Sequence, residues 1–180
     1  MGLVCLLGGA RSGKSRLAVT LAARGGGPVT FLATGEARDA EMADRIERHQ
    51  RERPASWRTI EEPLRLEHAI GLAAPHDCLI IDCLSLWVAN ALAAGTAEDV
   101  EQAGAAVAAH AACRPGATIA VSNEVGLGLV PSTALGRTYR DVLGRVNAGW
   151  AAAADRAFLV VAGRVLPLSP PELIEEPHAR

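Results

Sequence analysis

The chain has 180 residues and a formal net charge of -2, and 49% of its residues are hydrophobic although only 3% are aromatic. This length suits one well-filled core and is short for two domains. The slightly acidic balance excludes the basic surface of a nucleic-acid-binding protein, and no apolar stretch has the length of a membrane span. Four cysteines without metal-site spacing, and an N-terminus that enters a strand directly, predict a cytoplasmic protein.

Apolar runs alternate with helical patterns along the chain, which predicts an α/β fold with a mostly parallel sheet flanked by helices. A further segment at 164–168 contains Pro167 and is typical of an antiparallel edge strand near the C-terminus. We expect one domain over residues 1–168 and a proline-rich tail over 169–180. The predicted strands span 3–7, 29–33, 78–81, 118–121 and 158–162, and the predicted helices span roughly 14–24, 40–52, 64–73, 84–94, 97–113 and 133–154.

A glycine-rich stretch lies between the first apolar run and the first helical pattern and matches GxxxxGK[ST]. Backbone N–H groups of such a loop cradle phosphate oxygens, and the following helix adds the positive end of its dipole. Lys14, the only lysine of the chain, is expected to reach the β- and γ-phosphates, and the Ser15 hydroxyl to bind Mg²⁺. These features indicate a P-loop NTPase-type, RecA-like sheet. The stretch consists of Gly8, Gly9, Ala10, Arg11, Ser12, Gly13, Lys14 and Ser15.

Asp82 ends the third apolar run, a pattern that in P-loop proteins places a carboxylate on Mg²⁺. An aspartate at the end of a strand also serves as a turn residue in many proteins. Because a P-loop precedes it, we favour the metal-binding role for Asp82, together with Ser15.

The segment from 34 to 62 is unusual for a simple nucleotide kinase. Asp39 is placed to cap a helix on which Met42, Ile46 and His49 share one face. A neutral His49 imidazole amid arginines could attack phosphorus, with the arginines holding the phosphate charge. The residues alone favour the simpler interpretation, a surface helix stabilised by Arg–Glu pairs four positions apart.

Two later motifs also leave alternatives open. Glu124, in the sequence Asn-Glu-Val-Gly after the fourth run, could act at a metal or as a general base, or it could be a solvated loop residue. Arg145, within the last predicted helix, could hold a phosphate or form an ion pair on the helix surface. The sequence favours the ion pair.

Four stretches occur in a specific order: GGARSGKS at 8–15, DAEMADRIERHQRERPASWRTIEEP at 39–63, CLIIDCLSLWVANAL at 78–92, and VSNEVGLGLVPSTALGRTYRDVLGRVNAGWAAAAD at 121–155. Together they resemble the bifunctional adenosylcobinamide kinase / adenosylcobinamide-phosphate guanylyltransferase family of cobalamin biosynthesis. The resemblance covers about residues 3–168. It implies phosphorylation of the aminopropanol hydroxyl of adenosylcobinamide by ATP or GTP. Transfer of GMP from GTP through a guanylylated histidine follows and gives adenosyl-GDP-cobinamide.

The resemblance also implies roles for individual residues. His49 matches the family's histidine, although some relatives have two adjacent histidines where this chain has Arg48 and His49. Some relatives carry Glu where Asp82 stands. The corrinoid is the implied partner, and a homotrimer the implied assembly. The implied nucleotide contacts beyond the P-loop are Ala33, Thr34, Gly35, Gln50, Arg51, Glu52, Arg53, Glu61 and Asp82.

Two other functions are compatible with the P-loop alone. A small-molecule kinase without guanylyl transfer would bind the triphosphate but never form the covalent adduct. A nucleotide-dependent binding or switch protein would hydrolyse slowly and ignore corrinoids.

Overall fold

The computed structural model describes residues 2–37, 39–51 and 53–170, while the side chains of Glu41, Arg45 and His49 lie outside the description. Residues 171–180 of the expected tail are also outside it. The strands are β1 (Leu3–Gly8), β2 (Val29–Ala33), β3 (Arg58–Glu61), β4 (Cys78–Asp82), β5 (Thr118–Asn123), β6 (Arg156–Val161) and β7 (Arg164–Leu168). The helices are α1 (Lys14–Arg24), α2 (Ala40–Arg51), α3 (Leu66–Leu72), α4 (Leu84–Ala94), α5 (Ala97–Ala112) and α6 (Ala134–Ala153).

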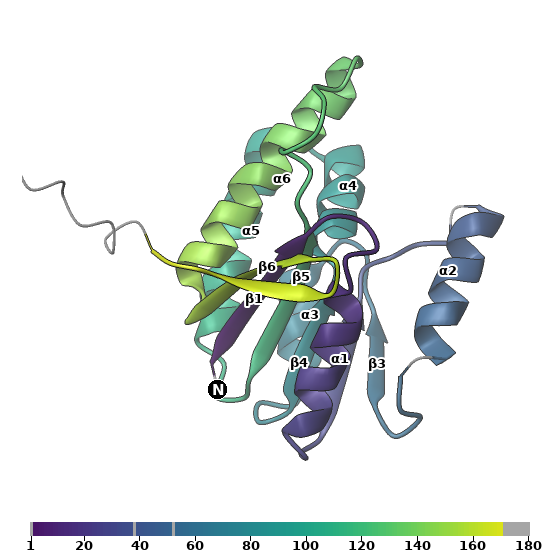
Figure 1. The fold of residues 1–180 in the computed structure, drawn as a ribbon, viewed down its shortest axis with the longest axis vertical. Coiled ribbons are helices and arrows are strands. Elements are labelled where there is room, and N and C mark those ends of the chain that lie inside the picture. Colours follow the sequence, from purple (N-terminus) through teal and green to yellow (C-terminus); the bar gives the residue numbers. More distant parts are fainter. Residues whose placement is uncertain (1, 38, 52, 171–180) are drawn as a thin grey trace, which may run out of the picture.

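The strands form one sheet in the order β3-β2-β4-β5-β1-β6-β7 (Figure 1). All neighbouring pairs are parallel except β6 and β7. One strand, β5, separates β1 from β4, which is the RecA-like arrangement expected from the sequence. The carboxyl ends of β1 and β4, which carry the two nucleotide motifs, therefore open on the same edge of the sheet.

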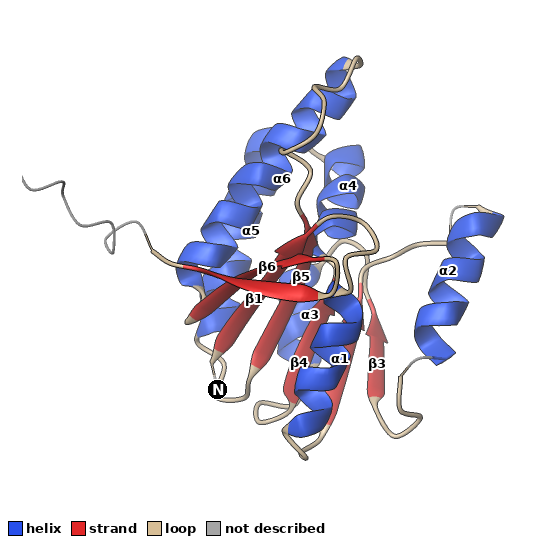
Figure 2. Cartoon of the chain, viewed as in Figure 1, coloured by secondary structure: helices blue, strands red, loops and turns tan. Residues whose placement is uncertain are grey.

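Helices cover the two faces of the sheet unequally (Figure 2). Helices α3 to α6 pack on one face, where Ile81, Leu143 and Trp150 are fully buried. On the other face α1 packs through Ala18 and Ala22 onto Phe31 and neighbouring residues. Helix α2 stands apart from the sheet, beyond β3. None of the helices in the described ranges is long and apolar enough to cross a bilayer.

Most predicted elements are confirmed, with their caps. Asp39 caps α2 by accepting a 2.7 Å hydrogen bond from the Met42 N–H, and Thr133 caps α6 through the Gly136 N–H. The prediction of 158–162 for the fifth strand is wrong by two residues at its start and by one at its end, because β6 spans Arg156–Val161. Ala162 has a φ of 50° and forms the turn to β7 with Gly163, so it cannot continue the strand.

The edge strand β3 was missed by the sequence analysis. Its residues, Arg58 to Glu61, contain one large apolar side chain and are mostly exposed. The strand pairs only with β2. A short, polar strand at an edge lacks the apolar run that marks a buried strand.

The turn from β3 into α3 depends on one carboxylate. Glu62 accepts hydrogen bonds from the N–H groups of Leu64 and Arg65, at 3.1 and 3.0 Å, and it also pairs with the Arg65 side chain. The hydrogen bond from the Arg65 backbone is the largest cause that holds the pKa of Glu62 below its ordinary value of 4.5.

We expect Glu62→Gln to lower the free energy of unfolding by about 1 kcal/mol at pH 7, because the amide oxygen accepts the same bonds without charge. A carboxyl whose pKa is depressed by folding stabilises above its ordinary pKa and loses this contribution as the pH falls through its folded pKa. The difference between the two proteins should therefore be full above pH 4.5 and disappear at lower pH. Urea unfolding between pH 7 and pH 3 measures it. A difference that is the same at every pH would contradict this assignment.

Candidate active site

The loop between β1 and α1 is shaped by three residues with positive φ. Gly8 has a φ of 151°, Arg11 of 56° and Gly13 of 100°. Gly13 occupies the N-cap of α1 and has no side chain that could accept from the first N–H groups of the helix. These donors, together with the positive end of the helix dipole, form an anion-binding site.

The Lys14 side chain curls back over the loop and is only 6% exposed. Its ammonium donates to the carbonyl oxygen of Gly8 at 2.8 Å and to that of Gly9 at 2.7 Å. A longer contact of 3.4 Å joins it to the Ser12 hydroxyl. The cation is thus held within the loop that binds anions.

Two neighbouring segments fix the loop at its ends. The Glu124 N–H, just after β5, donates to the Gly8 carbonyl at 2.9 Å. The Gly163 N–H, in the turn between β6 and β7, donates to the Ser12 carbonyl at 2.9 Å. Gly8 also lies directly against β6, where a β-carbon on it would come within 2.3 Å of the Val160 carbonyl oxygen.

A cleft of about 640 Å³ opens beside the loop. It brings together predicted site residues from five separate parts of the chain. The predicted site residues that line it are Ser15, Ala33, Gly35, Gln50, Arg53, Glu61 and Asp82.

Sheet register explains why three of these residues meet. Ala33 pairs with Glu61 on one side and with Asp82 on the other, so the three lie in one row across β3, β2 and β4. The row is at the carboxyl end of all three strands, where ligands bind in open α/β sheets. Glu61 lies in this row because it is the last residue of β3, the strand that was not predicted from the sequence.

Arg53 is the cation of the cleft with the most unusual environment. Its guanidinium carbon lies 3.5 Å from the centre of the Phe31 ring. Burial lowers the pKa of Arg53, and the charges of Asp82 and Glu61 act in the opposite direction. Its Nη1 atom is buried and has no hydrogen-bond partner within the described part of the chain.

Thr34 stabilises the backbone next to the cleft. Its hydroxyl donates to the Cys83 carbonyl at 2.7 Å and accepts from the Cys83 N–H at 2.9 Å, which ties the end of β2 to the end of β4. Asn90 donates to the Thr34 carbonyl at 2.9 Å. Thr34 is fully buried, so it serves the neighbouring Gly35 and Asp82 by holding their backbone in place.

Helix α2 contributes unequally to the site. Gln50 lines the cleft and donates to a Glu61 oxygen at 3.2 Å, which links α2 to β3. Arg51 is exposed and pairs with Glu47 on its own helix, as expected for the Arg–Glu pairs of a surface helix. Glu52 lies outside the described residues. The backbone of His49 belongs to α2, but its side chain is not described.

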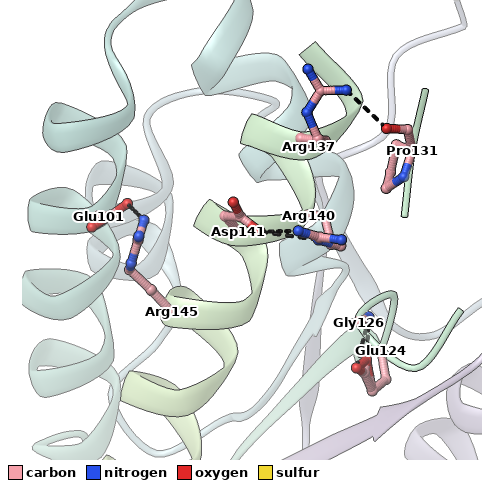
Figure 3. A network of polar contacts seen from close by, with 8 residues as sticks. All are labelled: Glu101, Glu124, Gly126, Pro131, Arg137, Arg140, Asp141 and Arg145. Carbon is pink, nitrogen blue, oxygen red and sulfur yellow. Dashed lines mark hydrogen bonds and ion pairs between the residues drawn. The ribbon is translucent and has the colours of Figure 1, made fainter. Parts of the chain in front are cut away.

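Glu124 and Arg145 both have local partners (Figure 3). Both carboxylate oxygens of Glu124 accept from the Gly126 N–H, at 2.8 and 2.9 Å, within the loop after β5. Arg145 pairs with Glu101 of α5 at 2.6 Å, so the ion pair that the sequence favoured is confirmed.

Several residues of the cleft were not identified as site residues from the sequence. Met42 and Ile46 had been recognised as one face of a helix, and their spacing of four residues was the available signal. The others follow predicted site residues closely in sequence but carry no motif of their own. The additional lining residues are Glu36, Ala37, Met42, Ile46, Pro63, Cys83 and Leu86.

The loop, its lysine and the aspartate two strands away define a protein of the P-loop class. The family model described as cobinamide kinase / cobinamide phosphate guanyltransferase matches residues 4–168. The bifunctional adenosylcobalamin biosynthesis protein CobP of Pseudomonas aeruginosa is 44% identical, over 91% of this chain and 95% of its own length. The corresponding CobU proteins of Salmonella typhimurium and Escherichia coli are 42% and 38% identical, each over 89% of this chain and 96% of their length.

The chain belongs to the cobinamide kinase / cobinamide phosphate guanyltransferase family, and it is an enzyme of adenosylcobalamin biosynthesis. The resemblance found in its four sequence motifs is confirmed.

The fit of Gly8 against β6 can be tested separately from catalysis. Gly8→Ala places a β-carbon against the Val160 carbonyl at a φ of 151°, so we expect a loss of about 3 kcal/mol or more in the free energy of unfolding. Gly9→Ala is the matched control, because a β-carbon there meets no atom within 4 Å. Urea unfolding compares the two variants. Equal stability of the two would show that the close approach is not a constraint.

Proposed function

We propose that a nucleoside triphosphate binds with its phosphates in the P-loop and with the rest of the molecule in the adjoining cleft. The observation that carries this proposal is the convergence of Ser15, Asp82 and Arg53 on one cleft. In it, the N–H groups of the loop and the Lys14 ammonium neutralise the phosphates. Arg53 adds a further cation to the lining of the cleft.

Ser15 and Asp82 form the proposed Mg²⁺ site. A hydroxyl and a carboxylate are hard oxygen donors, which suit this cation, and both line the same cleft. Mg²⁺ usually takes only one or two protein ligands and completes its shell with phosphate oxygens and water. When bound, it would supply neutralisation of the charge that develops on the phosphates.

In the kinase step, the hydroxyl of the aminopropanol arm of adenosylcobinamide attacks the γ-phosphorus of ATP or GTP and loses its proton to solvent. The bond from this phosphorus to the bridging oxygen breaks, and the diphosphate leaves. The protein contributes position and charge, because phosphoryl transfer needs little covalent chemistry from the enzyme. Lys14 is the first residue of α1. Its ammonium is the group that would stabilise the negative charge that develops on the leaving diphosphate.

In the guanylyl step, His49 is the proposed nucleophile. A nitrogen of its imidazole attacks the α-phosphorus of GTP, and the bond to the β-phosphate oxygen breaks and releases pyrophosphate. An oxygen of cobinamide phosphate then attacks the same phosphorus and breaks the P–N bond, which returns the histidine and gives the GDP-linked product. The covalent intermediate divides one difficult displacement into two easier ones.

The position of His49 in α2 supports this role. It follows Ile46 by three residues and precedes Gln50, and both of these residues line the cleft. Residues three apart on a helix lie on the same side of it. We also propose that the enzyme is cytoplasmic. From the resemblance to the family, we propose that it works as a homotrimer.

Lys14→Ala should lower the rate of cobinamide phosphorylation by about 100-fold or more, because the cation that stabilises the phosphates is removed. Arg16→Ala, an exposed cation two residues further along the same helix, is the control and should retain the rate. Transfer of label from γ-labelled nucleotide to cobinamide measures both. Full activity of the Lys14 variant would refute the P-loop assignment.

Incubation with α-labelled GTP should leave an acid-labile label on the protein, and His49→Ala should abolish it, because a P–N bond is acid-labile and position 49 supplies the nitrogen. His110→Ala, which changes an exposed histidine of α5, should retain the label. Label retained by the His49 variant would exclude this residue as the nucleophile. Loss of label from both variants would show that the effect is not specific to position 49.

A further inference from the structure

Two motifs singled out in the sequence have no part in the proposed function, and the structure joins them. Asn123 is the last residue of β5, the strand next to β1, and Glu124 follows it, while Asn147 lies on α6. Asn147 is only 7% exposed, and its amide donates to the Asn123 carbonyl at 2.9 Å. The contact links residues 24 positions apart, at the carboxyl edge of the sheet.

The peptide group between Asn123 and Glu124 connects Asn147 to the P-loop. The Asn123 carbonyl and the Glu124 N–H belong to one peptide unit, which is planar and rigid. That N–H donates to the Gly8 carbonyl at 2.9 Å, and the Gly8 carbonyl also accepts from the Lys14 ammonium at 2.8 Å. Asn147 is therefore connected to Lys14 through one rigid peptide and one shared carbonyl oxygen.

A purely structural role explains Asn147 poorly. Its side-chain oxygen is buried and has no hydrogen-bond partner among the residues that the structure describes. An unsatisfied buried acceptor destabilises a fold, and an apolar side chain of the same shape would remove that penalty. The amide at this position is thus useful for its donor, which is the atom that holds the peptide next to the P-loop.

We infer that Asn147 is a positioning residue for the phosphate-binding lysine. By fixing the peptide between Asn123 and Glu124, it keeps the Gly8 carbonyl where it holds the Lys14 ammonium. Successive hydrogen bonds also polarise one another, so the bond from Asn147 to the Asn123 carbonyl makes the Glu124 N–H a stronger donor to the Gly8 carbonyl. This inference rests on the proposed role of Lys14 in binding the phosphates.

The test is a double-mutant cycle with Asn147→Leu and Lys14→Ala. Leucine has nearly the shape of asparagine and removes the unsatisfied oxygen, while it leaves the Asn123 carbonyl without this donor, so we expect a variant that is moderately destabilised and still folds. In the wild-type background we expect kcat for cobinamide phosphorylation to fall about tenfold, with KM for the nucleotide changed less than threefold. In the Lys14→Ala background, Asn147→Leu should change the remaining rate less than twofold, because the group through which it acts is absent.

Trp150→Phe is the control for a general loss of stability. It removes the buried indole N–H of α6, about one turn from Asn147. This N–H has no partner among the described residues and no part in the connection to Gly8. We expect it to leave kcat unchanged after correction for the folded fraction, measured by thermal unfolding. If Asn147→Leu does not fold, Asn147→Ala takes its place in the cycle.

Equal effects of Asn147→Leu with and without Lys14, or wild-type kcat in the single variant, would overturn the inference. An equal loss in the Trp150 variant would do the same. If instead Lys14→Ala alone keeps full activity, the proposed role of Lys14 fails. An inactive Lys14 variant combined with an additive cycle refutes only the positioning role of Asn147.

Discussion

The carbonyl group of Gly8 is the point on which the site depends. It accepts hydrogen bonds from the Lys14 ammonium and from the Glu124 N–H, while the α-carbon of Gly8 lies against the Val160 carbonyl. Three strands therefore define the position of one residue: β1, which contains it, β5 and β6. The P-loop is held in place because its first residue is held by the sheet.

The sheet also determines the geometry of the cleft, because its register aligns the carboxyl ends of β3, β2 and β4. Ala33 aligns Glu61 with Asp82, and Thr34 ties β2 to β4 through two hydrogen bonds to Cys83. Arg53 closes this row from outside the sheet by stacking on Phe31. One side of the cleft is thus formed by the ends of the strands, and another by α2, the helix that carries the proposed nucleophile. This division suits an enzyme that performs two displacements on different phosphorus atoms of a nucleotide.

Much of this arrangement could be predicted from the sequence, for identifiable reasons. The P-loop combines glycines, a lysine and flanking patterns that few other structures share, and the buried strands are continuous apolar runs. Strand β3 gave no such signal, because Arg58 to Glu61 are mostly exposed and pair on one side only. Pro63 and Leu86 could not be identified as lining residues, since only the folded chain brings them to the cleft. Likewise, the bond between Asn147 and Asn123 joins two motifs whose proximity depends on the packing of α6 on the sheet.

The conformation of Lys14 has a thermodynamic consequence for affinity. A lysine that ranges freely in solvent loses about 1.5–2 kcal/mol of rotamer entropy when a ligand immobilises it. In this protein the side chain is already confined by the Gly8 and Gly9 carbonyls, so most of that entropy is lost during folding. In the proposed complex, phosphate oxygens would add to these carbonyl acceptors around a cation that is already ordered. Ordering this side chain therefore lowers the free energy of unfolding slightly. In the proposed complex, the affinity for the phosphates is higher because Lys14 is ordered before the substrate binds.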